Sequence, residues 1–436
     1  MDKELERSGG SQIGHPGDLI PLAPAVNLVE IGDTCIEPSA NFENDCGISR
    51  ICQEVSYAEF FCQYLVRNSP CIISNFVSND WESRKLWREG LKPSWSSLRE
   101  QFGDAEVPVA NCNEKEYNSQ KKSTFTLNKY LDYLEQHIEN GHQSSDPNLY
   151  LKDWHLTRDY PAAAVYRVPN YFASDWLNEY FCQRTDVHDD YRFVYIGPKG
   201  SWTPLHADVF TSFSWSVNIV GRKRWVLFPP GEEAHLKDRF GNLAYDIFSE
   251  EIHDLTKYPH CKKPGKLYDI IQEAGEAIFV PSGWHHQVWN LEDTISINHN
   301  WINGCNIRQI WIALSSCLLA VQKEVNDCSD MDGWHSHCQV MLRATHGMNF
   351  EEFYELLKCV AEPRIVQAKG GERVTLYGGW ELGTQHAVWD LKQISTTMDL
   401  FLSDPNVPIL PWVSTKKPRI LKENIDSILQ TSRNNK

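Results

Sequence analysis

The sequence predicts a mostly β protein with helical elements before and after the β core. Between Arg192 and Trp301 the pattern is one of short strands, rich in aromatic and β-branched residues and separated by Gly and Pro turns. Such a pattern is typical of an antiparallel barrel or jelly roll. After Gly304 the apolar spacing becomes helical. We therefore expect a jelly-roll core with N-terminal α/β elements and a C-terminal helical unit.

The chain divides into four expected segments. Residues 1–50 form a loosely ordered lead-in, rich in Gly, Pro, Ser and Asn, with one short strand at Val26–Ile31. Residues 51–145 make an N-terminal α/β part, and residues 146–303 make the β core. Residues 304–436 form the helical region.

Two helices and a strand are expected in the N-terminal α/β part. Ser56 and Glu59 match a capping box that opens a helix. Pro70–Phe76 reads as a buried strand. Thr126 precedes an apolar pattern of i, i+3, i+4 spacing, and Gly141 ends that helix.

The β core begins with an expected strand at Leu149–Trp154 and continues with another at Arg192–Ile196. Apolar strands follow at Phe213–Val220 and Trp225–Phe228. The segment Gly231–Leu267 is long, polar and rich in turn residues, so we expect a loop over the rim of the barrel.

Three helices are expected in the C-terminal region. One apolar face runs from Ile307 to Val321, a second helix opens at Asn349, and Val388–Phe401 indicates a third. Their apolar faces would pack either on the barrel or on another copy of the chain. The second arrangement would make a homo-oligomer.

Composition limits the classes of function. The chain has 436 residues, 41% hydrophobic and 23% charged, with a formal net charge of −16. The negative charge argues against nucleic acid as a direct partner, because phosphate binding needs a basic surface. No stretch approaches the roughly 18 apolar residues of a membrane span, and the charged start lacks a signal core. The 13 cysteines show no repeating spacing, which favours free thiols in a reducing compartment.

A His-x-Asp motif, His206-Ala207-Asp208, follows a Gly-Pro turn and precedes two apolar strands. Side chains two apart on a strand point to one face, so this pair can bind one metal ion. A further histidine comes at His285 or His286, and strand periodicity does not choose between them. Two histidines and one carboxylate leave three coordination positions open, as non-haem Fe(II) oxygenases require.

Other metal-binding patterns in the chain are weaker. His188-Asp189-Asp190 also reads His-x-Asp, but it stands in a polar run that we interpret as a solvated loop. Two clusters combine histidine and cysteine without the paired spacing of structural zinc modules, so loop chemistry is the favoured interpretation. These clusters are Cys328, His335, His337 and Cys338, and His253, His260 and Cys261.

These motifs resemble those of the JmjC family of 2-oxoglutarate oxygenases. The matching segments are Thr203-x-x-His206-x-Asp208, Gly221 to Trp225, Phe228 to Pro230, and Val280 to His286 with Asn290 four residues later. The match covers roughly residues 50 to 303 and implies a cupin-like double-stranded β-helix. Family members place the distal metal ligand four residues before an Asn. The resemblance therefore implies that His286, rather than His285, completes the set with His206 and Asp208.

The resemblance also implies Fe(II), 2-oxoglutarate as co-substrate, and O2. Lys223 would hold the far carboxylate of 2-oxoglutarate, with a hydroxyl of Thr203 or Tyr150 beside it. Ser216 stands where several relatives carry Asn, so its shorter side chain would reach the ligand through a water. The implied co-substrate contacts are Tyr150, Thr203, Ser216, Lys223, Asn298 and Asn300.

The flanking sequence, including Leu149–Trp154, is similar to a family member that hydroxylates lysine in a translation termination factor. The resemblance implies lysyl C-4 hydroxylation of eukaryotic release factor one. The cysteine usage and the charged start independently lead us to expect the cytoplasm, or also the nucleus. Demethylation of N-methyl-lysine or N-methyl-arginine is the alternative reaction. A cupin-like binding module without turnover is the alternative of another class, and the ligand set together with Lys223 argues against it.

Overall fold

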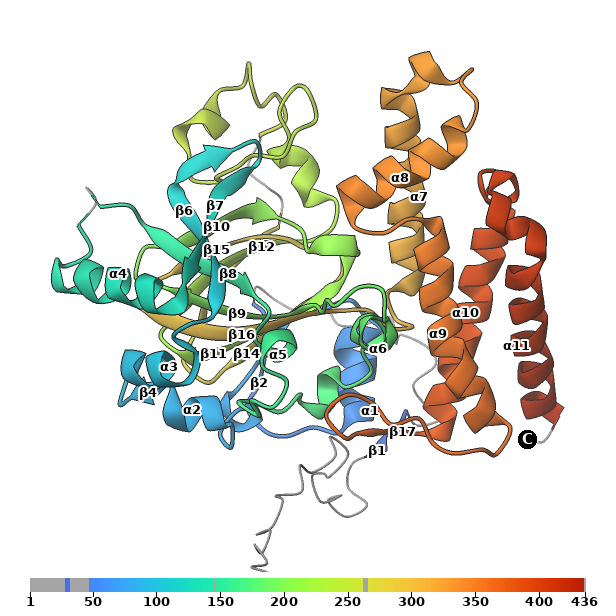
Figure 1. The fold of residues 1–436 in the computed structure, drawn as a ribbon, viewed down its shortest axis with the longest axis horizontal. Helices are drawn as coiled ribbons and strands as arrows, with labels where there is room; N and C mark the ends of the chain where they lie inside the picture. Colours follow the sequence, from blue (N-terminus) through green and yellow to red (C-terminus); the bar gives the residue numbers. More distant parts are fainter. Residues whose placement is uncertain (1–27, 32–46, 144–145, 262–265, 435–436) are drawn as a thin grey trace, which may run out of the picture.

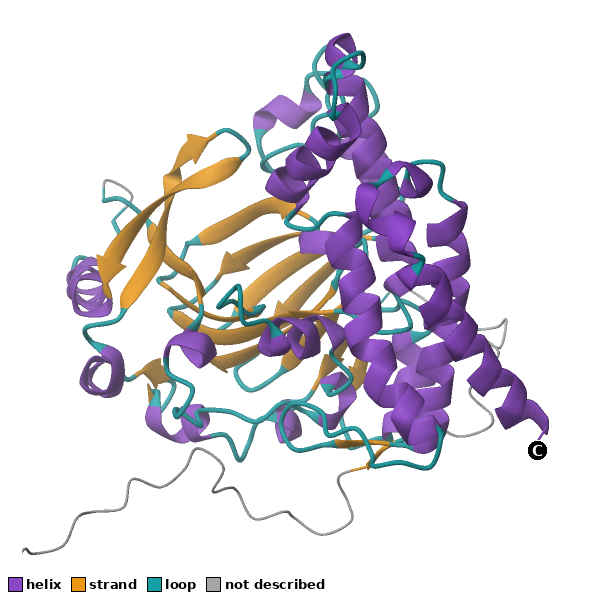
Figure 2. Cartoon of the chain, turned by 45° about the vertical axis from the view of Figure 1, so that its right-hand side comes forward, coloured by secondary structure: helices purple, strands orange, loops and turns teal. Residues whose placement is uncertain are grey.

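The computed structural model describes residues 28–31, 47–143, 146–261 and 266–434. Two parts lie side by side: β-sheets fill the left half of Figure 1, and the long C-terminal helices stand to their right. Figure 2 shows the same division by colour, with orange sheets beside purple helices. The site described below lies in the β part.

Eight consecutive strands form the core of the molecule. They are β9 (Arg192–Gly197), β10 (Trp202–His206), β11 (Phe213–Val220), β12 (Lys223–Phe228), β13 (Tyr268–Gln272), β14 (Ala277–Val280), β15 (His285–Asn290) and β16 (Thr294–Trp301). They are shared between two sheets with the orders β9-β16-β11-β14 and β10-β15-β12-β13. Every pairing within these two sets is antiparallel. This alternation is that of a double-stranded β-helix, so the expected fold class is confirmed.

The larger sheet is extended on both sides to nine strands. Beyond β14 lie β3 (Cys71–Ile73) and β2 (Ser49–Ile51), and beyond β9 lie β8 (Leu149–Trp154), β6 (Glu106–Glu116) and β7 (Ser119–Thr126). The strand expected at Leu149–Trp154 has the predicted bounds. The one expected at Pro70–Phe76 is shorter, because a 3-10 turn, η2 (Asn75–Val77), follows β3.

Short helices surround the sheet in the N-terminal half. Ser56 Oγ accepts from the Glu59 amide at 3.2 Å and opens the first of them, and Thr126 Oγ1 accepts from the Lys129 amide at 3.3 Å and opens α4, as expected. Within the strand expected at Val26–Ile31, Leu28–Val29 forms β1. The first two positions of the expected strand, 26 and 27, lie outside the described part. The helices are α1 (Tyr57–Phe60), η1 (Phe61–Leu65), α2 (Glu82–Leu86), α3 (Trp95–Phe102), α4 (Leu127–Glu139), α5 (Leu156–Asp159), η3 (Asn170–Phe172) and α6 (Trp176–Gln183); a small hairpin joins β4 (Arg88–Glu89) and β5 (Lys92–Pro93).

Alternation along the strands separates an apolar from a polar face of the large sheet. Trp215 and Val217 of β11 and Ile297 of β16 lie on the face turned away from the small sheet, where they pack in the main apolar core. The intervening residues of both strands are polar. They are Ser214, Ser216 and Asn218 on β11, and Ser296, Asn298 and Asn300 on β16. The polar face is therefore turned toward the small sheet, where the site lies.

The segment Gly231–Leu267 covers the outer face of the small sheet. It contains two 3-10 turns, η5 (Glu232–Leu236) and η6 (Glu250–His253), in otherwise irregular chain. Leu236 and Ile252 are buried against Leu205 and Phe228 of the sheet. The expected loop is thus packed onto the barrel, and residues 262–265 lie outside the described part.

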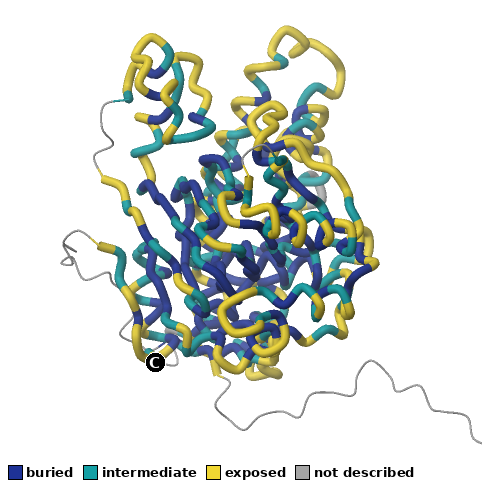
Figure 3. Tube along the Cα trace, turned by 90° about the vertical axis from the view of Figure 1, so that its left-hand side faces the viewer, coloured by how far each residue is buried: buried dark blue, intermediate teal, exposed yellow. Residues whose placement is uncertain are grey.

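The C-terminal region is helical, as expected. It contains α7 (Ile307–Glu324), η7 (Asn326–Cys328), α8 (Trp334–His346), α9 (Phe350–Ala368), α10 (Thr384–Ser403), η8 (Val407–Ile409), η9 (Pro411–Thr415) and α11 (Lys417–Asn434), with β17 (Glu381–Leu382) paired to β1. The predicted face from Ile307 to Val321 is buried, and Asn349 forms a complete capping box with Glu352. The helices α8 and α11 were not expected. Figure 3 shows the buried chain in the body of the molecule and exposed chain in the projections at the top.

The helical unit packs on the β part through one shared apolar cluster, so the first of the two expected arrangements is found. Trp176 and Leu177 of α6 pack in that cluster with Ile307 and Trp311 of α7.

No helix in the described ranges combines the length and apolarity that a membrane crossing requires. Ten described cysteines are free, but Cys62 is disulfide-bonded, so the expectation of free thiols does not hold at that position.

Candidate active site

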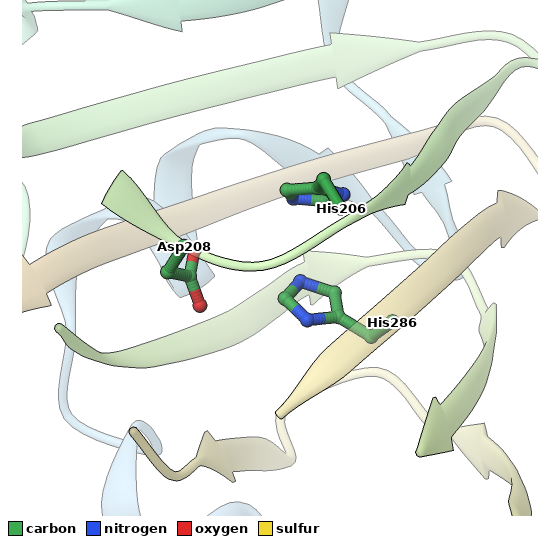
Figure 4. A group of neighbouring side chains, drawn as sticks. All are labelled: His206, Asp208 and His286. Atoms are coloured by element: carbon green, nitrogen blue, oxygen red, sulfur yellow. The ribbon is translucent and has the colours of Figure 1, made fainter. Parts of the chain in front are cut away.

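Three side chains that the sequence singled out meet between the two sheets (Figure 4). His206 ends β10, Asp208 follows two residues later, and His286 lies near the start of β15. The two strands are paired with His206 opposite His286. One ligand atom of each side chain lies within 4.8 Å of the others.

Backbone carbonyls fix which imidazole nitrogens are free. Nδ1 of His206 donates to the Pro204 carbonyl at 2.8 Å, and Nδ1 of His286 donates to the Trp284 carbonyl at 3.1 Å. Each ring therefore presents Nε2 as its available ligand atom. Burial and the neighbouring His206 lower the pKa of His286 to about 4, so its ring is neutral near pH 7. A neutral imidazole is the form that binds a metal ion.

The Asp208 carboxylate is oriented by two donors from the large sheet. Ser214 Oγ donates to Oδ2 at 2.7 Å, and Asn300 Nδ2 donates to Oδ1 at 3.0 Å. Asn300 also donates to Ser212 Oγ at 3.2 Å. Two imidazoles with free Nε2 atoms and one oriented carboxylate fit a facial Fe(II) site with open positions.

The neighbouring histidine points the other way. Nδ1 of His285 lies 3.9 Å from Oε2 of Glu233, which belongs to the segment over the small sheet. Adjacent residues of a strand face opposite sides, so His285 is turned away from Asp208 while His286 is turned toward it. The structure thus chooses between two registers that the sequence pattern left open.

The opposite end of the site holds a buried cation. Lys223 is 2% exposed, and its Nζ donates to Ser296 Oγ at 2.7 Å and to Tyr150 OH at 3.4 Å. Burial lowers the pKa of Lys223 to about 7. A ligand carboxylate placed here would supply the missing counter-charge, and the hydroxyls of Ser296 and Tyr150 lie beside it as hydrogen-bond donors.

One cavity of about 260 Å³ connects Lys223 with the three metal-site residues. The other expected contacts that line it are Tyr150, Thr203, Asn298 and Asn300. Ser216 is not among its described lining residues; its Oγ donates to Asn298 Oδ1 at 2.9 Å. Any effect of Ser216 on a ligand would therefore pass through Asn298. Asn300 reaches the cavity while bonded to Asp208.

Sequence reasoning missed several residues of the site, among them Ser296, which accepts from Lys223, and Ser214, which lines the cavity. Ser296 lies on the same face of β16 as Asn298 and Asn300, and Ser214 lies on the same face of β11 as Ser216. Strand alternation could therefore have identified both serines. Asp153 of β8 and Lys122 of β7 also line the cavity. No local signal in the sequence distinguished those two.

Among the described residues one further group, His155, Asp189 and Asp190, also brings its ligand atoms within 4.8 Å of one another. In the described ranges, neither cluster of histidine and cysteine gathers its members around a common point. The run at His188 is only partly solvated, because Asp190 is 1% exposed. His155 Nδ1 lies 2.7 Å from Asp190 Oδ1, and Arg192 Nε lies 3.1 Å from Asp190 Oδ2. We interpret this group as an ion-pair network.

Fold and site together define a cupin-like protein with a two-histidine, one-carboxylate metal centre, and a family model described as "Cupin-like domain" matches residues 57–306. The chain is 48% identical over 353 residues to human "2-oxoglutarate and iron-dependent oxygenase JMJD4", covering 80% of this chain and 84% of that protein. It is 46% identical over 394 residues to the Gallus gallus protein of the same name, covering 86% and 92%. It is 41% identical over 319 residues to "Arginine-specific demethylase JMJ20" of Arabidopsis thaliana, covering 69% and 67%.

The chain therefore belongs to the cupin-like JmjC family of 2-oxoglutarate and iron-dependent oxygenases. Its cofactors are Fe(II), 2-oxoglutarate and O2. Together they supply an oxidative decarboxylation that is coupled to oxidation of a C–H bond. The protein binds and orients the reactants and excludes water from them.

Proposed function

We propose that this oxygenase hydroxylates C-4 of a lysine in eukaryotic translation termination factor one. The support is the similarity of its motifs and flanks, including Leu149–Trp154, to a lysyl hydroxylase of that factor. The proposed substrate is a protein of the cytoplasm, so we also propose the cytoplasm as the place of action, with the nucleus as a second location.

The observation that carries the oxygenase reaction is a single cavity with two functional ends. His206, Asp208 and His286 lie at one end, and Lys223 lies at the other. A dicarboxylic 2-oxo acid needs both a chelating metal and a distant cation, and this cavity offers both. A binding module without turnover would have no use for this combination.

A second cavity supports a substrate larger than a free amino acid. It has a volume of about 410 Å³, shares Asp208 with the first, and is lined by Phe210 and by Ile310 and Leu314 of α7. A peptide that presents one side chain to the metal site would extend into this apolar space. We propose that residues flanking the target lysine bind here.

The experiment uses purified protein, Fe(II), 2-oxoglutarate and recombinant termination factor. We expect succinate formation that depends on the factor, and a mass gain of one oxygen on one lysine. Fragmentation spectra and chromatography against hydroxylysine standards then locate the oxygen on C-4. Absence of any oxygen on the factor, with succinate still formed, would refute this substrate assignment.

Arginine demethylation is the second candidate, because a relative of 41% identity carries the name of an arginine-specific demethylase. Both reactions begin with oxidation of a C–H bond, but demethylation attacks the carbon next to nitrogen and releases formaldehyde. A methylated arginine peptide tests it directly. Formaldehyde in a one-to-one ratio with succinate would establish the demethylase.

We further propose that the C-terminal helices can join two copies of the chain. Several large apolar side chains of these helices are exposed, among them Ile312 and Leu319 of α7. Light scattering on the purified protein measures the molar mass in solution. A mass of one chain across a hundredfold range of concentration would exclude this homo-oligomer.

A further inference from the structure

Asp153 lies at a β-bulge beside the cavity. The register between β8 and β9 shifts between Leu151 and Trp154, where β8 uses one residue more than its partner. Asp153 has a φ of 62°, in the left-handed region that side chains other than Gly rarely adopt. Leu151 and Trp154 both stay in the apolar core, while Lys152 and Asp153 both line the cavity. The bulge thus turns into the cavity a carboxylate that a regular strand would direct to the core.

Both oxygens of this carboxylate have a donor. Tyr195 OH donates to Oδ1 at 2.6 Å, and Lys122 Nζ donates to Oδ2 at 2.5 Å. Burial raises the pKa of Asp153, but the charge of Lys122 and the hydrogen bonds from Lys122 and Tyr195 outweigh it, and the pKa lies below its usual value. Asp153 is therefore an anion near pH 7. Its side chain is still 35% exposed, so a ligand can reach it.

The cavity has few other places for a cation. Among its described lining residues, the carboxylates are Asp153 and Asp208. Asp208 belongs to the metal site, and Lys223 at the far end suits an anion. A cationic side chain that enters this cavity is therefore attracted to Asp153.

The present partner of Asp153 is itself a lysine ammonium. Lys122 extends from β7, the edge strand of the large sheet, and its side chain is 48% exposed. Gln120, two residues earlier on the same face of β7, is buried and accepts a hydrogen bond from Lys152 Nζ at 2.7 Å. An ion pair between two partly exposed groups is held weakly, so another ammonium can replace Lys122.

We propose that Asp153 and Tyr195 bind the side-chain ammonium of the substrate lysine, and that the Lys122 ammonium occupies this place until the substrate displaces it. The inference rests on the proposed lysyl hydroxylation and names the residues that recognise its substrate. Three N–H donors of an unmethylated ammonium match the two oxygens of Asp153 and the Tyr195 oxygen. Each methyl group on the amine would remove one of these donors.

The first experiment needs neither iron nor turnover. n-Butylammonium is titrated into the protein and its binding is followed by ligand-observed NMR, with 1-butanol as the neutral probe. Lys122→Met removes the resident ammonium and keeps an apolar side chain. We expect it to bind n-butylammonium about fivefold more tightly than the wild type, the factor expected for displacing an exposed ion pair. 1-Butanol should bind both proteins equally.

The matched control is Lys121→Met on the same strand. Lys121 pairs with Glu114 at 3.0 Å outside the cavity, and both side chains are about half exposed. This variant should bind n-butylammonium as the wild type does. The gain in Lys122→Met should disappear in the double variant Lys122→Met/Asp153→Asn. Equal n-butylammonium binding by the wild type and Lys122→Met would overturn the inference, whatever the result with the termination factor.

The second experiment measures KM for the termination factor. Substrate recognition by Asp153 predicts opposite shifts: Asp153→Asn raises KM at least about tenfold, and Lys122→Met lowers it by the factor measured with n-butylammonium. A purely structural ion pair predicts shifts in the same direction, because either change breaks the pair. Thermal unfolding confirms that each variant is folded. A raised KM in both variants would show that the pair is structural and overturn the proposal.

Discussion

The side-chain amide of Asn300 donates a hydrogen bond of 3.0 Å to Oδ1 of Asp208. Asn300 lies on β16, which carries no residue of the proposed metal set, and it reaches Asp208 across the polar face of the large sheet. Ser214 Oγ bonds the other oxygen from β11. The large sheet therefore orients a carboxylate that the small sheet and its following turn provide.

Asn300→Ala should lower the affinity for Fe(II), because the Asp208 carboxylate loses one of its two orienting donors. Loss of a hydrogen bond to a metal ligand typically costs about 10- to 100-fold in metal affinity. Mn(II), which does not oxidise readily, serves as the titrant in an equilibrium binding measurement. Asn298→Ala is the control, since Asn298 bonds Ser216 and not Asp208. Equal Mn(II) affinity in Asn300→Ala and the wild type would contradict this role.

Lys223→Ala should weaken 2-oxoglutarate binding strongly while Mn(II) stays bound. Removing one partner of a desolvated charge pair costs about 2–5 kcal/mol, which is roughly 30-fold or more in Kd. Calorimetric titration of the Mn(II)-loaded protein with 2-oxoglutarate measures the change. Lys223→Met controls for the lost volume and should show the same defect. An unaltered Kd in both variants would remove Lys223 from the binding site.

The low pKa of Lys223 predicts that stability depends on pH. Burial lowers this pKa from 10.5 to about 7 in the folded ligand-free protein. Between these two values the unfolded chain binds the additional proton, so stability rises with pH by at most about 1.4 kcal/mol per unit. Below pH 7 both states are protonated and this contribution is constant. Denaturant unfolding from pH 7 to pH 9.5 should show the rise in the wild type and lack it in Lys223→Ala.

Binding of 2-oxoglutarate should reverse this pKa shift. The ligand carboxylate favours the charged form of Lys223, so binding above pH 7 takes up a proton. The affinity should fall as pH rises from 7 to 9, by no more than about tenfold per unit. Calorimetry in two buffers of different ionisation enthalpy counts the protons. Binding at pH 8 without proton uptake would show that Lys223 is already charged in the free protein.

The fold was predictable because its strands and helices follow regular periods. The strand at Phe213–Val220 alternates faces, and the helix that begins at Ile307 repeats an apolar face, and both form as expected. The helix α11 also has apolar residues at helical spacing, Leu421, Ile425 and Ile428. This helix was not predicted, because most of its other residues are polar and the apolar stripe is short. A short apolar stripe is recognised as such only when its packing partners are known.

Regular spacing predicted only part of the candidate site. The two-residue spacing of His206 and Asp208 placed them together, but periodicity left His285 and His286 open, and the family resemblance indicated His286. Asp153 was not predictable, because a regular strand would place it on the core face with Leu151. A β-bulge with a positive φ at Asp153 reverses that orientation. The formation of such a bulge depends on the partner strand, so the sequence of β8 alone does not predict it.

His286→Ala and His285→Ala should have unequal effects on metal binding. His286 presents Nε2 to the site shared with His206 and Asp208, whereas His285 faces Glu233 on the other side of the strand. Two remaining ligands hold a labile divalent metal poorly, so His286→Ala should lose Mn(II) and all turnover of 2-oxoglutarate. His285→Ala should keep Mn(II), because only its contact with the covering segment is lost. Metal content and succinate formation are measured on both variants after thermal unfolding shows that each is folded. Loss of Mn(II) from His285→Ala alone would mean that the register of β15 is shifted by one residue.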